Sequence, residues 1–400
     1  MSEDRALNGP AEAKRGDAPQ PTPFQQFILK IHSRCQLSCR YCYMYEMADQ
    51  SWRSQPRSMS PRVIDDIARR IGEHIRTHDL GEIEVILHGG EPLLAGAEII
   101  SYAVTSIRRA VDVGTQVHVV VQTNAVMLDE AFLHLFDSLG VRIGVSLDGY
   151  EAANDRHRLF ANGKGSYAQV SEALHRLTTG RYHHLFNGIL CTVDIRNDPI
   201  GVYQALSEFD PPVIDFLLPH GNWTAPPPFR DPQSAETPYA EWLIRIFDHW
   251  YDSPRAETDV RFFVEIIRLL MGSASRVEAI GLSPTRMVVV ETNGVIEHSD
   301  ILKSAYEGAG ATGMHVMRDS FDAVMTHPAV LARQRTLFGL PDVCKSCDIH
   351  RICGGGLHAH RFREETGFGN PSVYCPDLYR LISHIHGRLA KDVAKIRSSR

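Results

Sequence analysis

The sequence predicts an α/β protein built on parallel strands, from the alternation of its elements and from their number. Between Phe24 and about residue 220, short apolar runs alternate six times with amphipathic stretches. The expected strands are Phe27–His32, Ile83–His88, Val117–Gln122, Arg142–Leu147, Phe186–Val193 and Val213–Leu218. Such alternation forms parallel βα units with right-handed crossovers. Six units are too few for a closed eight-fold barrel, so an open doubly wound sheet and an incomplete barrel both remain possible.

Individual elements are marked by local signals. Ser60 is an expected N-cap, and Pro61 occupies the first position of the helix that follows. Residues 221–238 contain five prolines and indicate a linker, and Tyr239–Met271 indicates two amphipathic helices. Met287–Val290 followed by the turn sequence Glu-Thr-Asn-Gly predicts a hairpin.

Composition limits the classes of function. Of the 400 residues, 43% are hydrophobic and 22% are charged, and the net charge of -6 disfavours nucleic acid as a partner. No apolar run approaches the ~20 residues that cross a bilayer, so we expect no membrane partner and a cytoplasmic protein. Residues 1–22 lack apolar periodicity and are expected to be a disordered leader.

Three cysteines lie directly after the first expected strand, with Cys-x3-Cys-x2-Cys spacing: Cys35, Cys39 and Cys42. Zinc sites usually close with four ligands, and no fourth cysteine is near in the sequence. Three thiolates can hold a [4Fe–4S] cluster and leave one iron open. The open iron can bind S-adenosylmethionine (SAM), whose reductive cleavage gives a 5′-deoxyadenosyl radical.

A second group contains four cysteines near the C-terminus: Cys344, Cys347, Cys353 and Cys375. Four thiolates suit either a zinc ion or an iron–sulfur cluster, and spacing alone leaves both open.

The first cysteine group and the strand ends around it resemble the radical SAM superfamily, whose core is a partial (β/α)6 barrel. The resemblance covers roughly residues 24–220 and implies that 23–220 form this barrel. It implies SAM contacts at C-terminal strand ends, where such barrels place their sites. These residues are Gly89, Gly90 and Glu91 after the second strand, Gln122 and Asn124 after the third, Ser146 and Asp148 after the fourth, Arg158 on the SAM carboxylate, and Tyr41 on the adenine.

The second group, with its Cys-Gly-Gly-Gly run, resembles the SPASM extension of radical SAM peptide maturases. The resemblance implies a linker with bridging helices over 221–280 and a SPASM-like domain over 281–400. Ligands of one auxiliary cluster are missing, since Leu357 and Ser299 occupy two cysteine positions and 270–290 contain no cysteine. We therefore expect a single auxiliary [4Fe–4S] cluster. Asp300 and Asp215 are the expected catalytic bases; for Asp300 a turn-capping role is the alternative.

Three segments (24–30, 42–47 and 215–220) are similar to the FxsB-like group, whose members resemble enzymes that cross-link ribosomally made peptides. This implies a cyclophane, in which an aromatic ring carbon is joined to a side-chain β-carbon of a precursor peptide. The implied partners are that peptide and a reductase, flavodoxin or ferredoxin as electron donor. The alternatives are oxidation of Cys or Ser to formylglycine, as in anaerobic sulfatase maturases, and a non-catalytic metal-cluster protein that binds a peptide.

Overall fold

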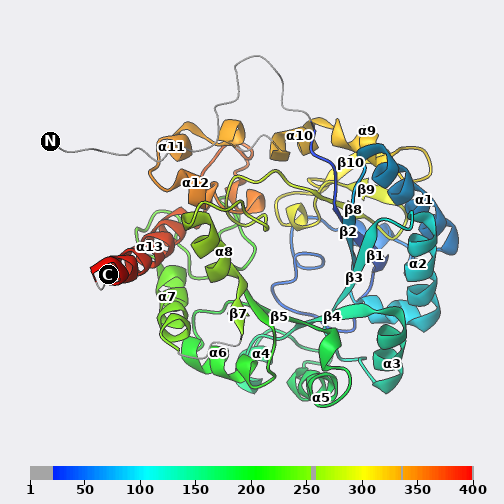
Figure 1. The fold of residues 1–400 in the computed structure, drawn as a ribbon, viewed down its shortest axis with the longest axis horizontal. Helices are drawn as coiled ribbons and strands as arrows, with labels where there is room; N and C mark the ends of the chain where they lie inside the picture. Colours follow the sequence, from blue (N-terminus) through cyan, green and yellow to red (C-terminus); the bar gives the residue numbers. More distant parts are fainter. Residues whose placement is uncertain (1–20, 254–257, 335–336, 399–400) are drawn as a thin grey trace.

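Six parallel strands form an open barrel in the computed structural model, which describes residues 21–253, 258–334 and 337–398 (Figure 1). They pair in sequence order, each with the next. The strands are β1 Gln26–His32, β2 Glu82–Gly89, β3 Gln116–Thr123, β4 Val141–Ser146, β5 Phe186–Thr192 and β6 Val213–Leu217. All six predicted strands are therefore confirmed, and the incomplete barrel is the correct alternative.

Helices cover the outside of the strands (Figure 1). They are α1 Pro61–His78, α2 Gly96–Ala110, α3 Glu130–Leu139, α4 Glu151–Asn154, α5 Tyr167–Thr178 and α6 Pro199–Ser207. Helix α1 begins as predicted, because the Ser60 hydroxyl accepts the Val63 N–H at 3.3 Å. Its Ile64, Ile67 and Ile71 are buried at the spacing of one helix face.

The sheet continues beyond β1 and β6 into one order of ten strands, β10-β9-β8-β1-β2-β3-β4-β5-β6-β7. The two-residue β7 Asp259–Val260 follows β6. On the other side, β8 Met287–Val290 pairs with β1 in parallel. The expected hairpin connects β8 to β9 Val295–Glu297, and β10 Ala311–His315 forms the edge. The last part of the chain therefore extends the barrel sheet through the first strand.

The two faces of each barrel strand differ in polarity. On β1, Phe27 packs against His74 of α1, so Phe27, Leu29 and Ile31 face the helices. Lys30 has the opposite parity and faces the inside of the barrel, beside His88 of β2 in the strand register. The inside of the barrel is therefore polar at this level.

The expected bridging helices are α7 Pro238–Tyr251 and α8 Arg261–Leu270, and they pack against α13 Cys375–Ser398. Asp377 of α13 accepts the first N–H groups of α7, from Tyr239 at 2.9 Å and Ala240 at 3.0 Å. Shorter helices precede α13: α9 Phe321–Met325, α10 Pro328–Gln334, α11 Asp342–Lys345 and α12 His350–Cys353. The domain boundaries at 220 and 280 stay predictions.

Two other predictions concern the ends of the chain and the membrane. Of the expected leader 1–22, residues 1–20 lie outside the described residues. In the part of the chain that is described, every helix is too short or too polar to cross a bilayer.

Candidate active site

The three cysteines of the first group lie together in the loop between β1 and α1. The Cys42 N–H donates to the Cys39 carbonyl at 3.0 Å, which folds the loop into a turn. The Cys35 sulfur accepts N–H groups from Leu37 at 3.4 Å and Asn124 at 3.5 Å. Burial, reinforced by the neighbouring charges, raises the pKa of Cys35 to about 12. Burial and Cys39 raise that of Cys42 to about 11.

The spacing of these thiols suits a cluster better than a single ion. A tetrahedral zinc ion, with Zn–S distances of about 2.3 Å, holds its sulfur ligands within about 4 Å of one another. Among the described residues, the one group of three or more Cys, His, Asp and Glu ligand atoms within 4.8 Å contains no cysteine. The three thiols are therefore too widely spaced for one tetrahedral ion, and three is the number of thiolates expected for a cluster with one open iron.

The Gly89-Gly90-Glu91 segment follows β2 and packs on the cysteine loop. A Cβ on Gly89 would lie 2.0 Å from the His32 carbonyl, and one on Gly90 would lie 2.5 Å from the Arg34 carbonyl. Only glycine permits this approach. The Glu91 N–H donates to the Arg34 carbonyl at 2.9 Å, which fixes the two loops together.

The Glu91 side chain is buried and fully engaged within the protein. One oxygen accepts the Leu93 N–H at 3.0 Å and the Thr123 hydroxyl at 2.6 Å, and the other accepts the Asn124 N–H at 2.8 Å. Glu91 therefore joins the ends of β2 and β3.

Tyr41, Asp148 and Arg158 form a buried polar group. The Tyr41 hydroxyl donates to Asp148 and accepts from the Arg158 guanidinium at 3.1 Å. Burial raises the pKa of Asp148 despite the nearby Arg158 charge. The Arg158 Nε has no hydrogen-bond partner among the described residues. An unpaired, buried guanidinium N–H is a site for an anionic group, as a SAM carboxylate would provide.

Other predicted SAM contacts lie at neighbouring strand ends. The Gln122 amide donates to the Ser146 hydroxyl at 3.0 Å, linking β3 to β4. Asn124 contacts Cys35 and accepts the Gln36 amide at 3.2 Å. The structure therefore brings the predicted contacts to one edge of the sheet, the edge that carries the cysteine loop.

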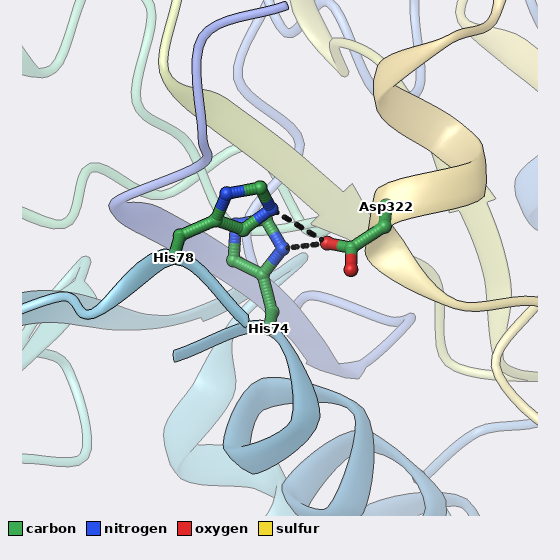
Figure 2. A group of neighbouring side chains, drawn as sticks. All are labelled: His74, His78 and Asp322. Atoms are coloured by element: carbon green, nitrogen blue, oxygen red, sulfur yellow. Dashed lines mark hydrogen bonds and ion pairs between the residues drawn. The ribbon is translucent and has the colours of Figure 1, made fainter. Parts of the chain in front are cut away.

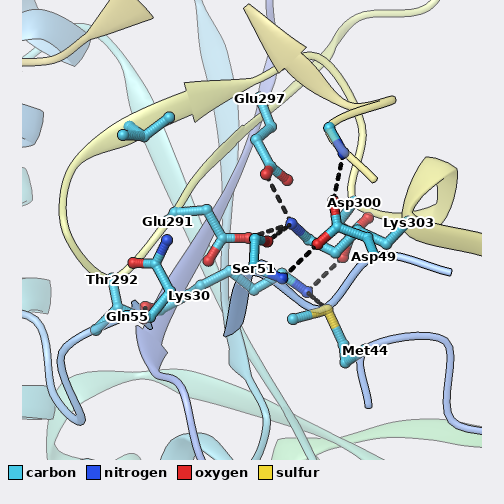
Figure 3. A network of polar contacts seen from close by, with 12 residues as sticks. Lys30, Met44, Asp49, Ser51, Gln55, Glu291, Thr292, Glu297, Asp300 and Lys303 are labelled. Carbon is cyan, nitrogen blue, oxygen red and sulfur yellow. Dashed lines mark hydrogen bonds and ion pairs between the residues drawn. The ribbon is translucent and has the colours of Figure 1, made fainter. Parts of the chain in front are cut away.

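Asp300 lies inside the barrel in a network that includes Lys30 (Figure 3). It forms a buried salt bridge with Lys30 and accepts the Tyr43 hydroxyl at 2.6 Å. Burial alone would raise the pKa of Asp300, but Lys30 and then His88 lower it more, to well below its usual value. Asp300 is therefore ionised, and it reaches Tyr43, which directly follows Cys42.

Asp215 occupies a different environment. Its carboxylate pairs with Arg261 at 3.2 Å, and burial raises its pKa in spite of Arg261. The two predicted bases thus have different partners. Asp215 pairs with Arg261 of α8, whereas Asp300 contacts Lys30 of β1 and Tyr43 of the cysteine loop.

Sequence reasoning missed the roles of Lys30, Tyr43 and His220 around Asp300. The His220 ring packs edge-on against Tyr43 at 5.0 Å. Burial lowers the pKa of His220 to about 4, and burial together with Lys30 lowers that of His88 to about 4, so both rings are neutral. One signal was available, since Lys30 is a lone cation within an apolar strand.

The four cysteines of the second group also gather, although Cys375 is remote in sequence. The pKa of Cys353 is raised first by burial and then by the nearby Cys375 and Cys344. The pKa of Cys375 is likewise raised by burial and then by Cys344 and Cys347. None of them belongs to the close group of ligand atoms found in the described residues. Their sulfur atoms are therefore more widely spaced than the ligands of a single zinc ion.

Around the hairpin that precedes one of the missing ligand positions, Ser299, the structure has a charged network (Figure 3). Ser299 is fully buried and its hydroxyl has no partner among the described residues. Four residues further along the chain, Lys303 bonds Glu297 at 2.6 Å and Glu291 at 3.2 Å. Burial and Glu291 raise the pKa of Glu297.

Comparison with known proteins identifies the domain. Residues 29–191 match the family model of the Radical SAM superfamily. This region is therefore similar to radical SAM domains, and the protein is an enzyme with oxidoreductase-type radical chemistry. The family employs a [4Fe–4S] cluster and SAM, which the cysteine loop and its surroundings fit.

About nine tenths of the chain is similar to sulfatase-maturating enzymes. It is 22% identical over 392 residues to a serine-type anaerobic sulfatase-maturating enzyme of Bacteroides thetaiotaomicron, covering 92% of this chain and 91% of the relative. It is 22% identical over 372 residues to a cysteine-type enzyme of Clostridium perfringens, covering 92% and 97%. The structure of anSMEcpe with bound AdoMet and Cp18Cys peptide matches with a TM-score of 0.76 and 20% identity, over 94% and 100% of the two chains.

These relatives overturn the predicted cyclophane cross-link and favour the formylglycine alternative. The prediction depended on segments such as Phe24–Lys30, in which Phe24, Phe27 and Leu29 are buried. Such residues reflect packing of the first strand, which is independent of the fate of a substrate radical. Membership of the FxsB-like group is not confirmed.

Iron content tests the two cysteine groups. We expect about eight irons per reconstituted chain, and a loss of about half in Cys42→Ala and in Cys375→Ala. Cys191→Ala removes a buried thiol outside both groups and should retain all iron. Iron and sulfide analysis measures this; full retention by Cys375→Ala would contradict the second cluster.

Gly90→Ala tests the glycine contact. The added Cβ must displace the Arg34 carbonyl, which belongs to the cysteine loop. We expect SAM affinity to fall roughly tenfold or more, equivalent to about 1.4 kcal/mol or more. Gly81→Ala, whose Cβ meets no atom within 4 Å, is the matched control. Equal SAM affinity in both variants, by equilibrium dialysis, would refute this role.

Proposed function

We propose that the protein oxidises a serine or cysteine side chain of a peptide or protein substrate to formylglycine. The observation that carries the proposal is the similarity to serine-type and cysteine-type sulfatase-maturating enzymes along about nine tenths of the chain. The substrate would be a segment of a sulfatase or a related protein, bound in extended form near the cysteine loop.

The proposed cofactor contacts follow from the site. Cys35, Cys39 and Cys42 would hold the first cluster, and the unpaired Nε of Arg158 would bind the SAM carboxylate. The backbone of Gly89–Glu91 would approach the SAM amino group. Gln122, Asn124, Ser146, Asp148 and Tyr41 would shape the remaining surface, through the hydrogen bonds that connect them.

The reaction is a two-electron oxidation. When bound, the clusters and SAM supply a radical that removes one hydrogen atom from the side-chain carbon, and an oxidised centre that takes one electron. The substrate radical that remains must then lose one electron and one proton, so a base is required to take the proton. Serine then gives the aldehyde directly, and cysteine gives a thioaldehyde that water converts to the aldehyde with release of H2S.

Asp300 is the base that the site supports best. It is ionised and buried, and its partner Tyr43 is adjacent to Cys42 in the chain. Lys30 would position Asp300 and keep it ionised. Asp215 is the second candidate; it is also ion-paired, with Arg261, but burial raises its pKa and it has no contact with the cysteine loop in the hydrogen bonds found among the described residues.

Residues 281–400 would form a SPASM-like region with one auxiliary [4Fe–4S] cluster on Cys344, Cys347, Cys353 and Cys375. Lys303 and its two glutamates would replace the second auxiliary cluster in the space around Ser299. A reductase, flavodoxin or ferredoxin would supply the electron that starts each turnover.

Product mass tests the function. Incubated with SAM, a reductant and serine- or cysteine-containing sulfatase peptides, the enzyme should lower the serine peptide by about 2 Da and the cysteine peptide by about 18 Da, as the proposed bond changes require. Both products should add an aldehyde-reactive hydroxylamine. A 2 Da loss without that adduct would contradict an aldehyde product; Cys42→Ala is the inactive control.

Asp300→Asn tests the base. A lost general base costs about 100-fold or more in product formation, while SAM cleavage should persist and become uncoupled from product. The measurement is the ratio of deoxyadenosine to aldehyde. Asp215→Asn tests the second candidate in the same assay, and an unchanged ratio in Asp300→Asn would exclude Asp300.

Lys30→Met tests the positioning role through pH. In the wild type, Asp300 stays ionised far below neutral pH, so its protonation should not limit activity between about pH 5 and 8. Without Lys30, burial raises the Asp300 pKa, and activity should fall at the acid end of this range. A variant whose pH profile keeps the wild-type shape at lower overall rate would indicate a purely structural role.

A further inference from the structure

A second cluster of possible metal ligands lies away from the cysteines, where α1 meets α9 (Figure 2). His74 and His78 are four residues apart on α1, so they share one helix face. Both point to the same oxygen of Asp322, from His74 Nδ1 at 2.5 Å and from His78 Nε2 at 3.0 Å. The three ligand atoms all lie within 4.8 Å of one another.

The backbone behind His74 allows its ring to serve as a ligand. The His74 Nε2 lies 3.0 Å from the Phe24 N–H and 3.2 Å from the Phe24 carbonyl. In one tautomer Nε2 accepts the N–H, and Nδ1 donates to Asp322. In the other, Nε2 donates to the carbonyl and the Nδ1 lone pair is free for a metal. A backbone carbonyl behind the distal nitrogen is the usual support of a metal-binding histidine.

Charge and access suit a cation. The Asp322 carboxylate supplies the negative charge at the site, and the buried His74 ring faces it through Nδ1. The side chains of His78 and Asp322 are 23% and 36% exposed, which gives an ion a path from solvent. Two imidazoles and one carboxylate form a ligand set typical of zinc and related divalent transition metals, with water completing the tetrahedron.

We propose that His74, His78 and Asp322 bind a divalent transition metal ion of the zinc type. The site lies beside Phe24, just before β1 begins, whereas the cysteine loop follows the end of β1. The ion is therefore remote from the radical chemistry. It joins α1, the entry to β1 and α9, three segments that are otherwise distant in sequence, and so stabilises the contact between the barrel and the C-terminal part of the chain.

Zinc binding to the cluster-loaded protein tests the proposal. After dialysis against micromolar free Zn2+ under anaerobic conditions, the wild type should hold one zinc per chain with its iron content unchanged. His78→Ala and Asp322→Ala alter partly exposed side chains and should lose that zinc. His134→Ala, an exposed histidine of α3, should retain it. Zinc-edge X-ray absorption should give nitrogen and oxygen ligands without sulfur.

Three outcomes would overturn the site: no zinc on the wild type, full zinc on His78→Ala or Asp322→Ala, or a sulfur ligand shell, which would place the ion on the cysteines. An ion that binds only the folded state stabilises it. Zinc addition should therefore raise the Tm of the wild type and of His134→Ala, but not that of His78→Ala or Asp322→Ala.

Discussion

The buried ammonium group of Lys30 determines how the C-terminal part of the chain must pack on the barrel. Its side chain is 1% exposed, and an unpaired charge in that position would cost several kcal/mol. Its partner Asp300 comes 270 residues later, directly after the hairpin that extends the sheet. Removal of either partner would leave a buried charge, so the C-terminal segment must close on the barrel for the pair to form.

The same interaction connects the fold to the chemistry. Strand register places Lys30 beside His88, whose neutral ring accepts the Gly89 N–H at 2.8 Å. The glycine segment then packs on the cysteine loop, and Tyr43 of that loop returns a hydrogen bond to Asp300. A continuous series of contacts thus joins the glycine segment, the cysteine loop and the Asp300 carboxylate. A change in one of these groups therefore displaces the others.

Local patterns made much of the fold predictable. Apolar periodicity located the six barrel strands, and Ser60, Pro61 and the turn after Val290 marked where elements begin. The pairing of β8 with β1 was not predictable, because both strands are short apolar runs that carry no information on their partners. The cysteines were found because cluster chemistry fixes their spacing, and the glycines because the resemblance to a known family implies them after the second strand. The reaction was predicted wrongly, because the cofactor site is separate from whatever determines the fate of the substrate radical.

The pairing of β8 with β1 also has a consequence for synthesis of the chain. Strand β1 emerges from the ribosome about 260 residues before the strand that covers its outer edge. Throughout that interval the edge of β1 has unpaired backbone hydrogen-bonding groups, which favours pairing with other chains. The late arrival of its partner gives a nascent chain a long period in which the barrel is open beside the cysteine loop, and makes closure by residues 287–290 a slow, non-local step.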